Sequence, residues 1–247
     1  MNFLTHLFDI NTTFFTVANY PMSYIEFFGT IFNIWCVWLT ARAKTLSWPI
    51  GLLGSVLYLF LFFQIQLYSD FFEQVYFILT GVMGWYMWVR NKKEIDETKD
   101  VVIVSLNSIK ENAVYVAILI VGTAIMTYVT MNLTVWLPAY FTEPVSLPVL
   151  DALTTVMSFI AQWLLMKKKV ESWALWILVD IIGIGLYWYK GVRFISLEYV
   201  LFLIIATAGL FNWIKNYKLH KLYDKSTQQS IQEGVSDREV LPAPQWS

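Results

Sequence analysis

Charged residues are scarce in this sequence, and cysteine and histidine are scarcer still. Asp, Glu, Lys and Arg make up 14% of the 247 residues, against roughly 25% in an ordinary soluble domain. The single cysteine, Cys36, excludes an intrachain disulfide and a thiolate metal cluster. The two histidines, His6 and His220, lie before the first and after the last hydrophobic run. This placement argues against a histidine-built metal or nucleophile site between those runs.

Motifs for energy coupling and nucleic-acid binding are also missing. No GxxxxGK[ST] stretch occurs, which excludes ATP-driven transport by this chain itself. The formal net charge of −1 leaves no strongly basic face for nucleic acid. We therefore expect a protein that is not an enzyme, with no cofactor, no metal site and no nucleic-acid partner.

Hydrophobic residues supply 57% of the chain, and 18% of all residues are aromatic. A soluble protein of this size could not hide so many apolar side chains. A helix that crosses the lipid bilayer needs about 20 apolar residues. Seven runs qualify: Tyr24–Ala41, Trp48–Gln66, Phe71–Val89, Ala113–Met131, Leu147–Met166, Trp173–Tyr189 and Leu197–Ile214. The sequence therefore predicts an all-α membrane protein with seven transmembrane helices.

The positions of Lys and Arg predict the orientation in the membrane. Fifteen of the 17 basic residues follow the first, third, fifth or seventh run, and only Lys190 and Arg193 lie elsewhere. Because basic residues collect in cytoplasmic loops, we expect the N-terminus outside and the C-terminus in the cytoplasm. The first twenty residues hold no Lys or Arg and are predicted to lie on the outer membrane interface. From Thr227 onward the chain is polar and is expected to be disordered.

An internal repeat appears when the chain is shifted on itself by 125 positions, without a gap. The shift aligns Trp38 with Trp163, Trp48 with Trp173, Glu73 with Glu198, Gly84 with Gly209 and Trp88 with Trp213. Each copy holds three runs, and the unmatched fourth run lies between them, so the two copies must have parallel orientations. Transporters built from such repeats bind substrate between the copies near the midplane.

This 3+1+3 arrangement divides the chain into five parts. They are an outer interfacial segment (1–22), a first three-helix repeat (23–93), a cytoplasmic loop with the linker helix (94–147), a second three-helix repeat (148–218) and a cytoplasmic tail (219–247). The last residues of the tail, Trp246 and Ser247, resemble the opening of a streptavidin-binding affinity tag.

Four acidic residues form two pairs related by the repeat: Glu26 with Asp151, and Glu73 with Glu198. All four lie near the outer starts of the predicted helices, where free N–H groups and the helix dipole stabilise carboxylates. We expect a structural role for them, with gating of the outer mouth as the alternative.

Asp180 is the one charged residue predicted to lie deep inside a span, about 10 Å from the start of its helix. Its repeat partner is Ser55, so the repeat does not require a carboxylate there. Trp173 and Trp176 share one helical stripe with Asp180, and Tyr187 continues it. Two indoles and a carboxylate on one face predict a site for a flat or cationic aromatic group.

Three amides could complete such a site: Asn33, Gln162 and Asn212. Amides in membrane helices also bond neighbouring helices together for a modest gain of about 0.6 kcal/mol each. Gln162 and Asn212 are the stronger candidates because their repeat partners, Val37 and Met87, are apolar.

The segment Trp173-x-x-Trp176-x-x-x-Asp180 resembles the WxxWxxx[N/D] motif of the Pnu family of bacterial vitamin transporters. Together with the duplicated layout, the resemblance covers nearly the whole chain. It implies uptake of nicotinamide riboside across the bacterial inner membrane by facilitated diffusion with alternating access. It further implies a homotrimer, and trapping of the substrate by a cytoplasmic riboside kinase. The first copy holds Trp48, Gly51 and Ser55 at the motif positions, which implies a single asymmetric site.

The sequence is also compatible with other functions. Thiamine and riboflavin also have rings that stack on tryptophan, and the 3+1+3 layout is similar to that of the SWEET sugar transporters. A proton-coupled symporter could use Asp180 to carry a proton. A retinal photoreceptor is excluded because Leu197–Ile214 contains no lysine.

Overall fold

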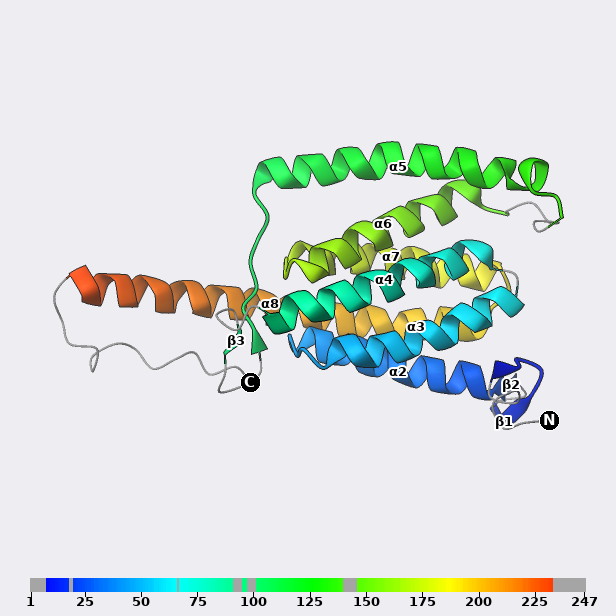
Figure 1. Ribbon diagram of the computed structural model, residues 1–247, viewed down its shortest axis with the longest axis horizontal. Helices are drawn as coiled ribbons and strands as arrows, with labels where there is room; N and C mark the ends of the chain where they lie inside the picture. The colour runs from blue at the N-terminus through cyan, green and yellow to red at the C-terminus, as the bar shows by residue number, and fades with distance from the viewer. Residues whose placement is uncertain are drawn as a thin grey trace.

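A computed structural model describes residues 8–17, 20–65, 67–90, 95–96, 101–139 and 146–232. Seven long helices fill most of these ranges (Figure 1): α2 (Tyr24–Ala41), α3 (Ser47–Gln64), α4 (Tyr68–Arg90), α5 (Ile109–Trp136), α6 (Pro148–Met166), α7 (Glu171–Tyr189) and α8 (Arg193–Gln232). Six of these are long and apolar enough to cross a membrane. The exception is α4, whose first half contains Asp70, Glu73 and Gln74. The predicted helical membrane protein is confirmed, and α2 has the predicted bounds.

Local sequence signals set several helix ends. Ser23 and Glu26 form a reciprocal capping box at the start of α2, and Ser108 and Glu111 form another at the start of α5. Pro148 occupies the first turn of α6, where its missing N–H costs nothing. The structural role expected of Glu26 is therefore observed.

The turns after α2 and α6 have the same backbone conformation. Ala43 and Lys168 lie 125 positions apart, and within the described chain they are the two non-glycine residues with positive φ, 53° and 60°. The N–H of Ala43 donates to the carbonyl of Thr40 at 2.8 Å, and that of Lys168 donates to Leu165 at 2.9 Å. The sequence repeat is thus accompanied by repeated geometry at these turns.

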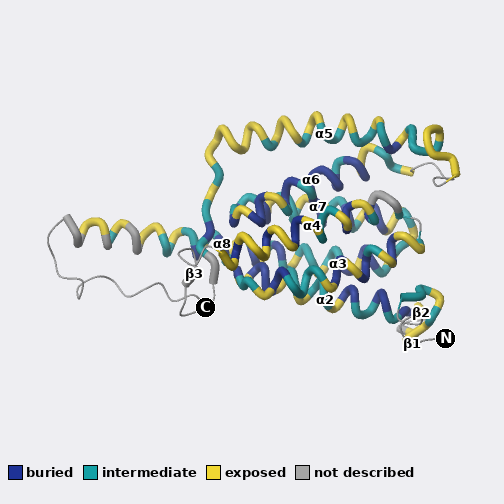
Figure 2. The backbone as a smooth tube through the Cα atoms, viewed as in Figure 1, coloured by how far each residue is buried: buried dark blue, intermediate teal, exposed yellow. Residues whose placement is uncertain are grey.

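Six helices form a closed ring, and α5 lies outside it. α3 packs between α2 and α4, α7 packs between α6 and α8, and the ring is closed by α2 on α8 and by α4 on α6. α5 packs mainly on α6, and Thr130 is its one buried residue (Figure 2). Its apolar surface suits contact with lipid rather than with water.

Four tryptophans pack together at the end of the ring that holds the α2–α3 and α6–α7 turns. Trp48 meets Trp88 edge to face at 5.3 Å between ring centroids, and the repeat-equivalent Trp173 meets Trp213 at 5.6 Å. The Trp88 Nε1 group donates to a backbone carbonyl of α6 at 3.1 Å, and Trp213 Nε1 donates to one of α2 at 2.9 Å. These bonds join the first copy to the second in matching ways.

Two antiparallel hairpins differ from the all-helical expectation: β1 (Thr13–Val17) pairs with β2 (Tyr20–Ser23), and β3 (Ile95–Asp96) pairs with β4 (Val101–Val102). Just before the first hairpin, the backbone N–H of Ile10 and the carbonyl of Phe8 bond the Gln64 side chain at 3.0 and 2.7 Å. The N-terminal segment is therefore tied to the end of α3.

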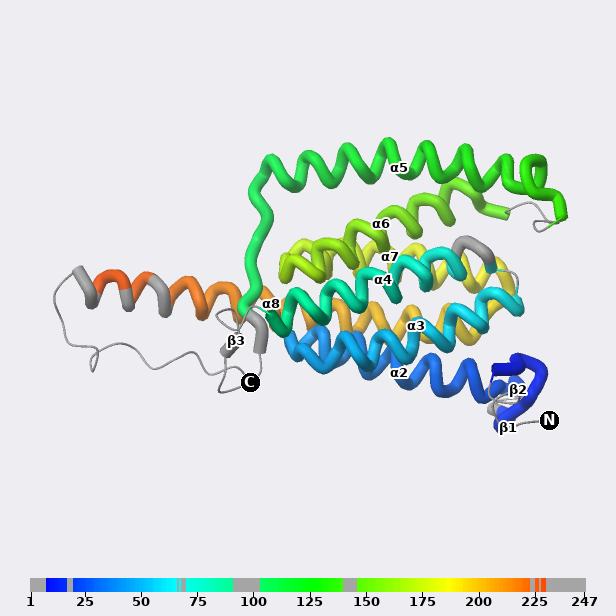
Figure 3. The backbone as a smooth tube through the Cα atoms, viewed as in Figure 1, coloured from blue at the N-terminus to red at the C-terminus, as the bar shows by residue number. Residues whose placement is uncertain are grey.

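The last helix is longer than predicted. α8 continues past the bundle to Gln232 (Figure 3), so the disorder expected from Thr227 onward is wrong as far as that residue. No glycine or proline occurs between Leu210 and Gln232, so nothing in this stretch breaks the helix. The resemblance of Trp246 and Ser247 to a tag lies outside the described residues.

Candidate functional site

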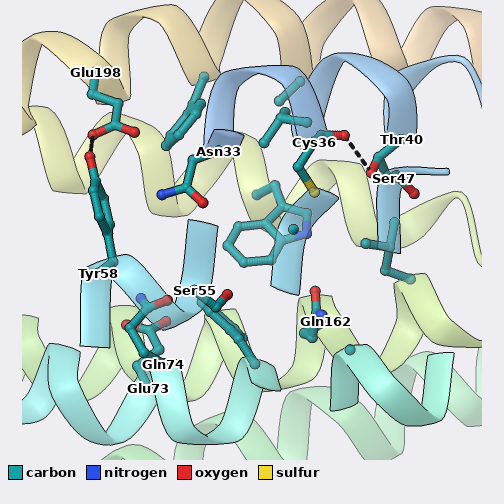
Figure 4. A pocket seen from close by; sticks show the side chains of 18 of the residues that line it. Asn33, Cys36, Thr40, Ser47, Ser55, Tyr58, Glu73, Gln74, Gln162 and Glu198 are labelled. Atoms are coloured by element: carbon teal, nitrogen blue, oxygen red, sulfur yellow. Dashed lines mark hydrogen bonds between the residues drawn. The ribbon is translucent and has the colours of Figure 1, made fainter. Parts of the chain in front are cut away.

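A cavity of about 180 Å³ lies inside the ring, and all six ring helices line it. α5 contributes no lining residue. Polar side chains from α2, α3, α4, α6 and α8 surround the same space, including Asn33, Ser55, Glu73, Gln162 and Glu198 (Figure 4). The cavity therefore lies between the two copies of the repeat, where the sequence predicted a substrate site.

Carboxylates dominate the charge of the cavity wall. Asp70, Glu73, Asp180 and Glu198 line it, and the described lining residues include no Lys, Arg or His. All four are buried, with exposures between 2% and 8%. A carboxylate buried at this depth requires a hydrogen-bond donor, a proton or a cation as its partner. The wall is suited to a cationic ligand.

Five of the seven candidate residues from the sequence line this cavity: Asn33, Gln162, Trp173, Trp176 and Asp180. The last three lie on one stripe of α7, as their spacing predicted. α2 positions Asn33 and α6 positions Gln162 on other sides of the cavity. The ring thus brings side chains from three helices to one place.

Asp180 is 3% exposed, and no hydrogen bond or ion pair joins its carboxyl group to another described residue. The repeat counterpart, Ser55, also lines the cavity. The structure therefore places an unpaired acidic group on one side of the cavity and a neutral hydroxyl on the other.

The two indoles of the α7 motif have different surroundings. Trp176 is half-buried and its ring lies 6.0 Å from that of Phe77, inclined at 58°. Trp173 is only 1% exposed and packs in the tryptophan cluster. Trp176 is the indole with more surface free to stack on a ligand.

Trp173 and its repeat counterpart Trp48 share an unusual feature. Both line the cavity, and both have a buried Nε1–H group without a partner among the described residues. A buried unpaired donor costs about 1–3 kcal/mol. A ligand with acceptor atoms could satisfy both groups.

Asn212 and Tyr187 are not brought to the cavity. The Asn212 side chain donates to the carbonyl of Ala41 at 2.8 Å, which bonds α8 to the end of α2. Tyr187 donates to Asp70 and stacks on Tyr199 at 5.0 Å. Seven residues separate Tyr187 from Asp180, or about 10 Å along the helix, so a shared stripe does not imply a shared site.

Tyr187 instead lines a smaller polar pocket beside the cavity, together with Asp70, Glu73 and Asp151. Lys190 forms an ion pair with Asp151 at 2.6 Å between Nζ and Oδ1. The lysine is 12% exposed and the aspartate 5%. The carboxylate of Asp151 is therefore neutralised within the protein.

Asp70 lines the cavity without having been predicted from the sequence, and the helix-start role predicted for two other acidic residues of the cavity is wrong. Glu73 and Glu198 lie past the first turn of α4 and α8, so stabilisation at a helix N-terminus does not describe them. They line the cavity instead, at 8% and 2% exposure. The repeat aligns these two glutamates in sequence. Their depth in the helix bundle, however, depends on where each helix begins and on the helices packed beside it.

Residues 23–215 match the family model described as nicotinamide mononucleotide transporter. The nicotinamide riboside transporter PnuC of Escherichia coli (strain K12) is 31% identical over 215 residues, covering 81% of this chain and 88% of that protein. The riboflavin/roseoflavin transporter RibM of Streptomyces davaonensis is 24% identical over 209 residues, covering 83% and 91%.

A solved structure is also similar: the crystal structure of the vitamin B3 transporter PnuC superposes with a TM-score of 0.64 at 25% sequence identity. The similarity covers 79% of this chain and 82% of that one.

Proposed function

The chain belongs to the nicotinamide mononucleotide transporter family, and from this we propose that it carries nicotinamide riboside across the bacterial inner membrane. The chain is a multi-pass membrane protein. Our proposal adds facilitated diffusion with alternating access, with the N-terminus outside and the C-terminus in the cytoplasm. The substrate site is the cavity inside the helix ring.

The charge of the cavity wall is the observation that carries this choice of substrate. Four carboxylates and no basic side chain are found among its described lining residues. The nicotinamide ring of the riboside is a cationic pyridinium, which such a wall attracts. The mononucleotide adds a phosphate, which needs Arg or Lys partners when it is buried. The wall therefore favours the riboside over the mononucleotide.

We assign the pyridinium ring to Trp176 and Asp180, which supply an aromatic face and a negative charge. Asn33 and Gln162 can bond the carboxamide or the ribose hydroxyls. Trp173 supplies an indole N–H at the end of the cavity near the α6–α7 turn. Asn212 and Tyr187, which bond other parts of the helix ring, are left out of the proposed site.

Alternating access is proposed to come from one three-helix repeat, 23–93, moving against the other, 148–218, with α5 as the linker. The matched turns at Ala43 and Lys168 and the two tryptophan pairs support this 3+1+3 division. The repeats meet only through α2 on α8 and α4 on α6 among the major helix contacts of the described chain. Sliding at these two contacts would open the cavity.

Two parts of the proposal rest on the resemblance to the Pnu family. We infer that a cytoplasmic riboside kinase traps the imported substrate by phosphorylation, and that three copies of the chain form a homotrimer. The apolar face of α5 is available for contact with lipid or with another copy.

The substrate is tested by calorimetric titration of the purified protein. We expect nicotinamide riboside to bind and nicotinamide mononucleotide to bind at least about a hundredfold more weakly, because its phosphate would be buried without a cation. Riboflavin, thiamine and a hexose serve as comparison ligands. Riboflavin is named in the description of the RibM relative. If the protein bound riboflavin in preference to the riboside, the choice of substrate would be wrong, but the proposal of a vitamin transporter would still hold.

The position of the site has an independent test, because the single cysteine, Cys36, lines the cavity. A small thiol reagent should modify Cys36, and bound riboside should slow this reaction. The Cys36→Ser protein provides the unmodified control. Labelling that riboside does not affect would contradict binding in this cavity.

Coupling is tested by riboside uptake into proteoliposomes. Facilitated diffusion predicts the same initial rate with and without a proton gradient. Acceleration by an inward proton gradient would favour the proton-coupled alternative.

A further inference from the structure

Glu198 presents one free carboxylate oxygen to the cavity. The residue lies on α8, lines the cavity and is 2% exposed. Its Oε2 accepts a hydrogen bond from the hydroxyl of Tyr58 on α3. Its Oε1 is buried and has no partner among the described residues. Figure 4 shows this second oxygen turned away from Tyr58, on the side of Asn33.

The hydrogen bonds around Tyr58 leave this oxygen for a ligand. Tyr58 has one proton, which it donates to Glu198. The Thr30 hydroxyl lies 2.7 Å from the Tyr58 oxygen. Thr30 is therefore the donor of that pair. Both Tyr58 and Thr30 lie beside the Glu198 carboxyl group, and Oε1 still has no hydrogen-bond partner among the described residues.

An ionised carboxylate oxygen accepts hydrogen bonds and cannot donate them. The ligand group at this position must therefore bring donors of its own. Neighbouring hydroxyls on a ribose ring are such donors, and the carboxamide NH₂ of the nicotinamide ring is another. The position of Glu198 in the cavity selects between these two groups.

The depth of Glu198 favours the ribose hydroxyls over the carboxamide. Asp180 lies nine residues before the end of α7, or about 14 Å from it, whereas Glu198 lies five residues after the start of α8, or about 8 Å from it. Because α7 and α8 are joined at that end of the ring, Glu198 lies about 6 Å nearer to it than Asp180. This offset is comparable to the distance from a pyridinium ring to the far hydroxyls of its ribose.

We propose that Glu198, positioned by Tyr58, accepts hydrogen bonds from the ribose hydroxyls of the transported nucleoside. The role rests on the proposed function, since it assumes a riboside in the cavity. The site then has two parts: Trp176 and Asp180 bind the ring, and Glu198 binds the sugar.

The repeat offers a matched control. Glu73 is the counterpart of Glu198, lines the same cavity and is 8% exposed. Unlike Oε1 of Glu198, neither of its carboxylate oxygens is among the buried unpaired atoms of the described chain. Glu73→Gln therefore removes one cavity charge without removing the proposed sugar contact.

The test compares nicotinamide riboside, its 2′-deoxy and 3′-deoxy analogues, and 1-methylnicotinamide, which has the cationic ring but no ribose. The parent protein should bind the riboside at least about tenfold more tightly than one of the deoxy analogues, because a bond to a charged acceptor is lost. In Glu198→Gln this preference should disappear and 1-methylnicotinamide affinity should change less than about twofold. The glutamine carbonyl can keep the Tyr58 bond, while its NH₂ group replaces the acceptor.

In Glu73→Gln the preference for the riboside over its deoxy analogues should persist. Equal weakening of the riboside and 1-methylnicotinamide by Glu198→Gln would show an effect of overall charge and overturn the proposal. If the parent protein bound the riboside and both deoxy analogues equally well, this result alone would overturn the proposal. Tyr58→Phe should reduce the preference only in part, since it loosens Glu198 but leaves the acceptor.

The outcomes separate the two proposals. A parent protein that binds no riboside contradicts the proposed function, and this role of Glu198 fails with it. A parent that binds riboside without discriminating against the deoxy analogues contradicts only the role of Glu198. Thermal unfolding of each variant shows whether it is folded.

Discussion

The indole of Trp48 lies directly on Gly84, and a Cβ atom added to that glycine would come within 2.3 Å of the ring. The same contact recurs 125 positions later, where an added Cβ on Gly209 would lie 2.9 Å from Trp173. In each copy the glycine of the third helix leaves room for the indole at the start of the second helix, and this indole lines the cavity. The two glycines thus determine where both indoles sit.

Gly84→Ala should lower stability by about 1–3 kcal/mol, because the added methyl group must displace a buried indole. Gly209→Ala should lower stability less, since the added Cβ would lie 2.9 Å from the indole rather than 2.3 Å. Gly185→Ala is the control: it lies on α7 with nothing within 4 Å of the added atom, and alanine is the better helix former. Apparent unfolding temperatures in detergent should follow this order, and similar losses for all three variants would contradict it.

Trp176→Ala should weaken riboside binding about 5- to 30-fold, the range expected for loss of a desolvated cation–π contact of about 1–2 kcal/mol. Trp176→Phe should retain part of the affinity, because a smaller aromatic face remains. Calorimetric titration measures both variants. Unchanged affinity in Trp176→Ala would remove this indole from the site.

Asp180→Asn should weaken binding of the cationic riboside by at least about tenfold, since the carboxylate is its proposed counter-charge. The reduced dihydronicotinamide riboside has nearly the same shape but no positive ring, and its affinity should change much less. The ratio of the two affinities isolates the charge effect. Equal losses for both ligands would indicate a structural role for Asp180.

Gln162 and Asn212 offer a comparison between two amides with different positions. Gln162→Ala should weaken riboside binding, because Gln162 lines the cavity. Asn212→Ala should leave the affinity unchanged and lower stability by about 1 kcal/mol, because it removes the bond to Ala41. Titration and thermal unfolding of the two variants, made in parallel, check both statements.

Lys190→Met should destabilise the protein by about 3–5 kcal/mol, because it leaves the buried Asp151 carboxylate without its partner. Adding Asp151→Asn should recover much of this loss by removing the uncompensated charge. Unfolding temperatures of the parent, both single variants and the double variant form a double-mutant cycle. Strictly additive effects would show that the ion pair contributes little.

Sequence predicted the parts of the site that lie on a single helix. Trp173, Trp176 and Asp180 share a stripe of α7 because the helical period is fixed by the backbone, whatever the neighbours are. Asn33 and Gln162 were found because polar residues are costly in a membrane span. The same reasoning failed for Asn212 and Tyr187, since a polar side chain can equally well bond a neighbouring helix.

The sequence by itself determined the membrane helices, the capping box of Ser23 and Glu26, and the repeat of 125 residues, because run length, caps and periodicity are local properties of the chain. Only the tertiary structure decided which polar side chains face the cavity. Asp70, Glu73 and Glu198 meet there because α4 and α8 pack where they do, and Asn212 faces away because α2 is beside it. The partner of a buried polar group depends on the helix that packs against it, and that neighbour is chosen by contacts far apart in the sequence.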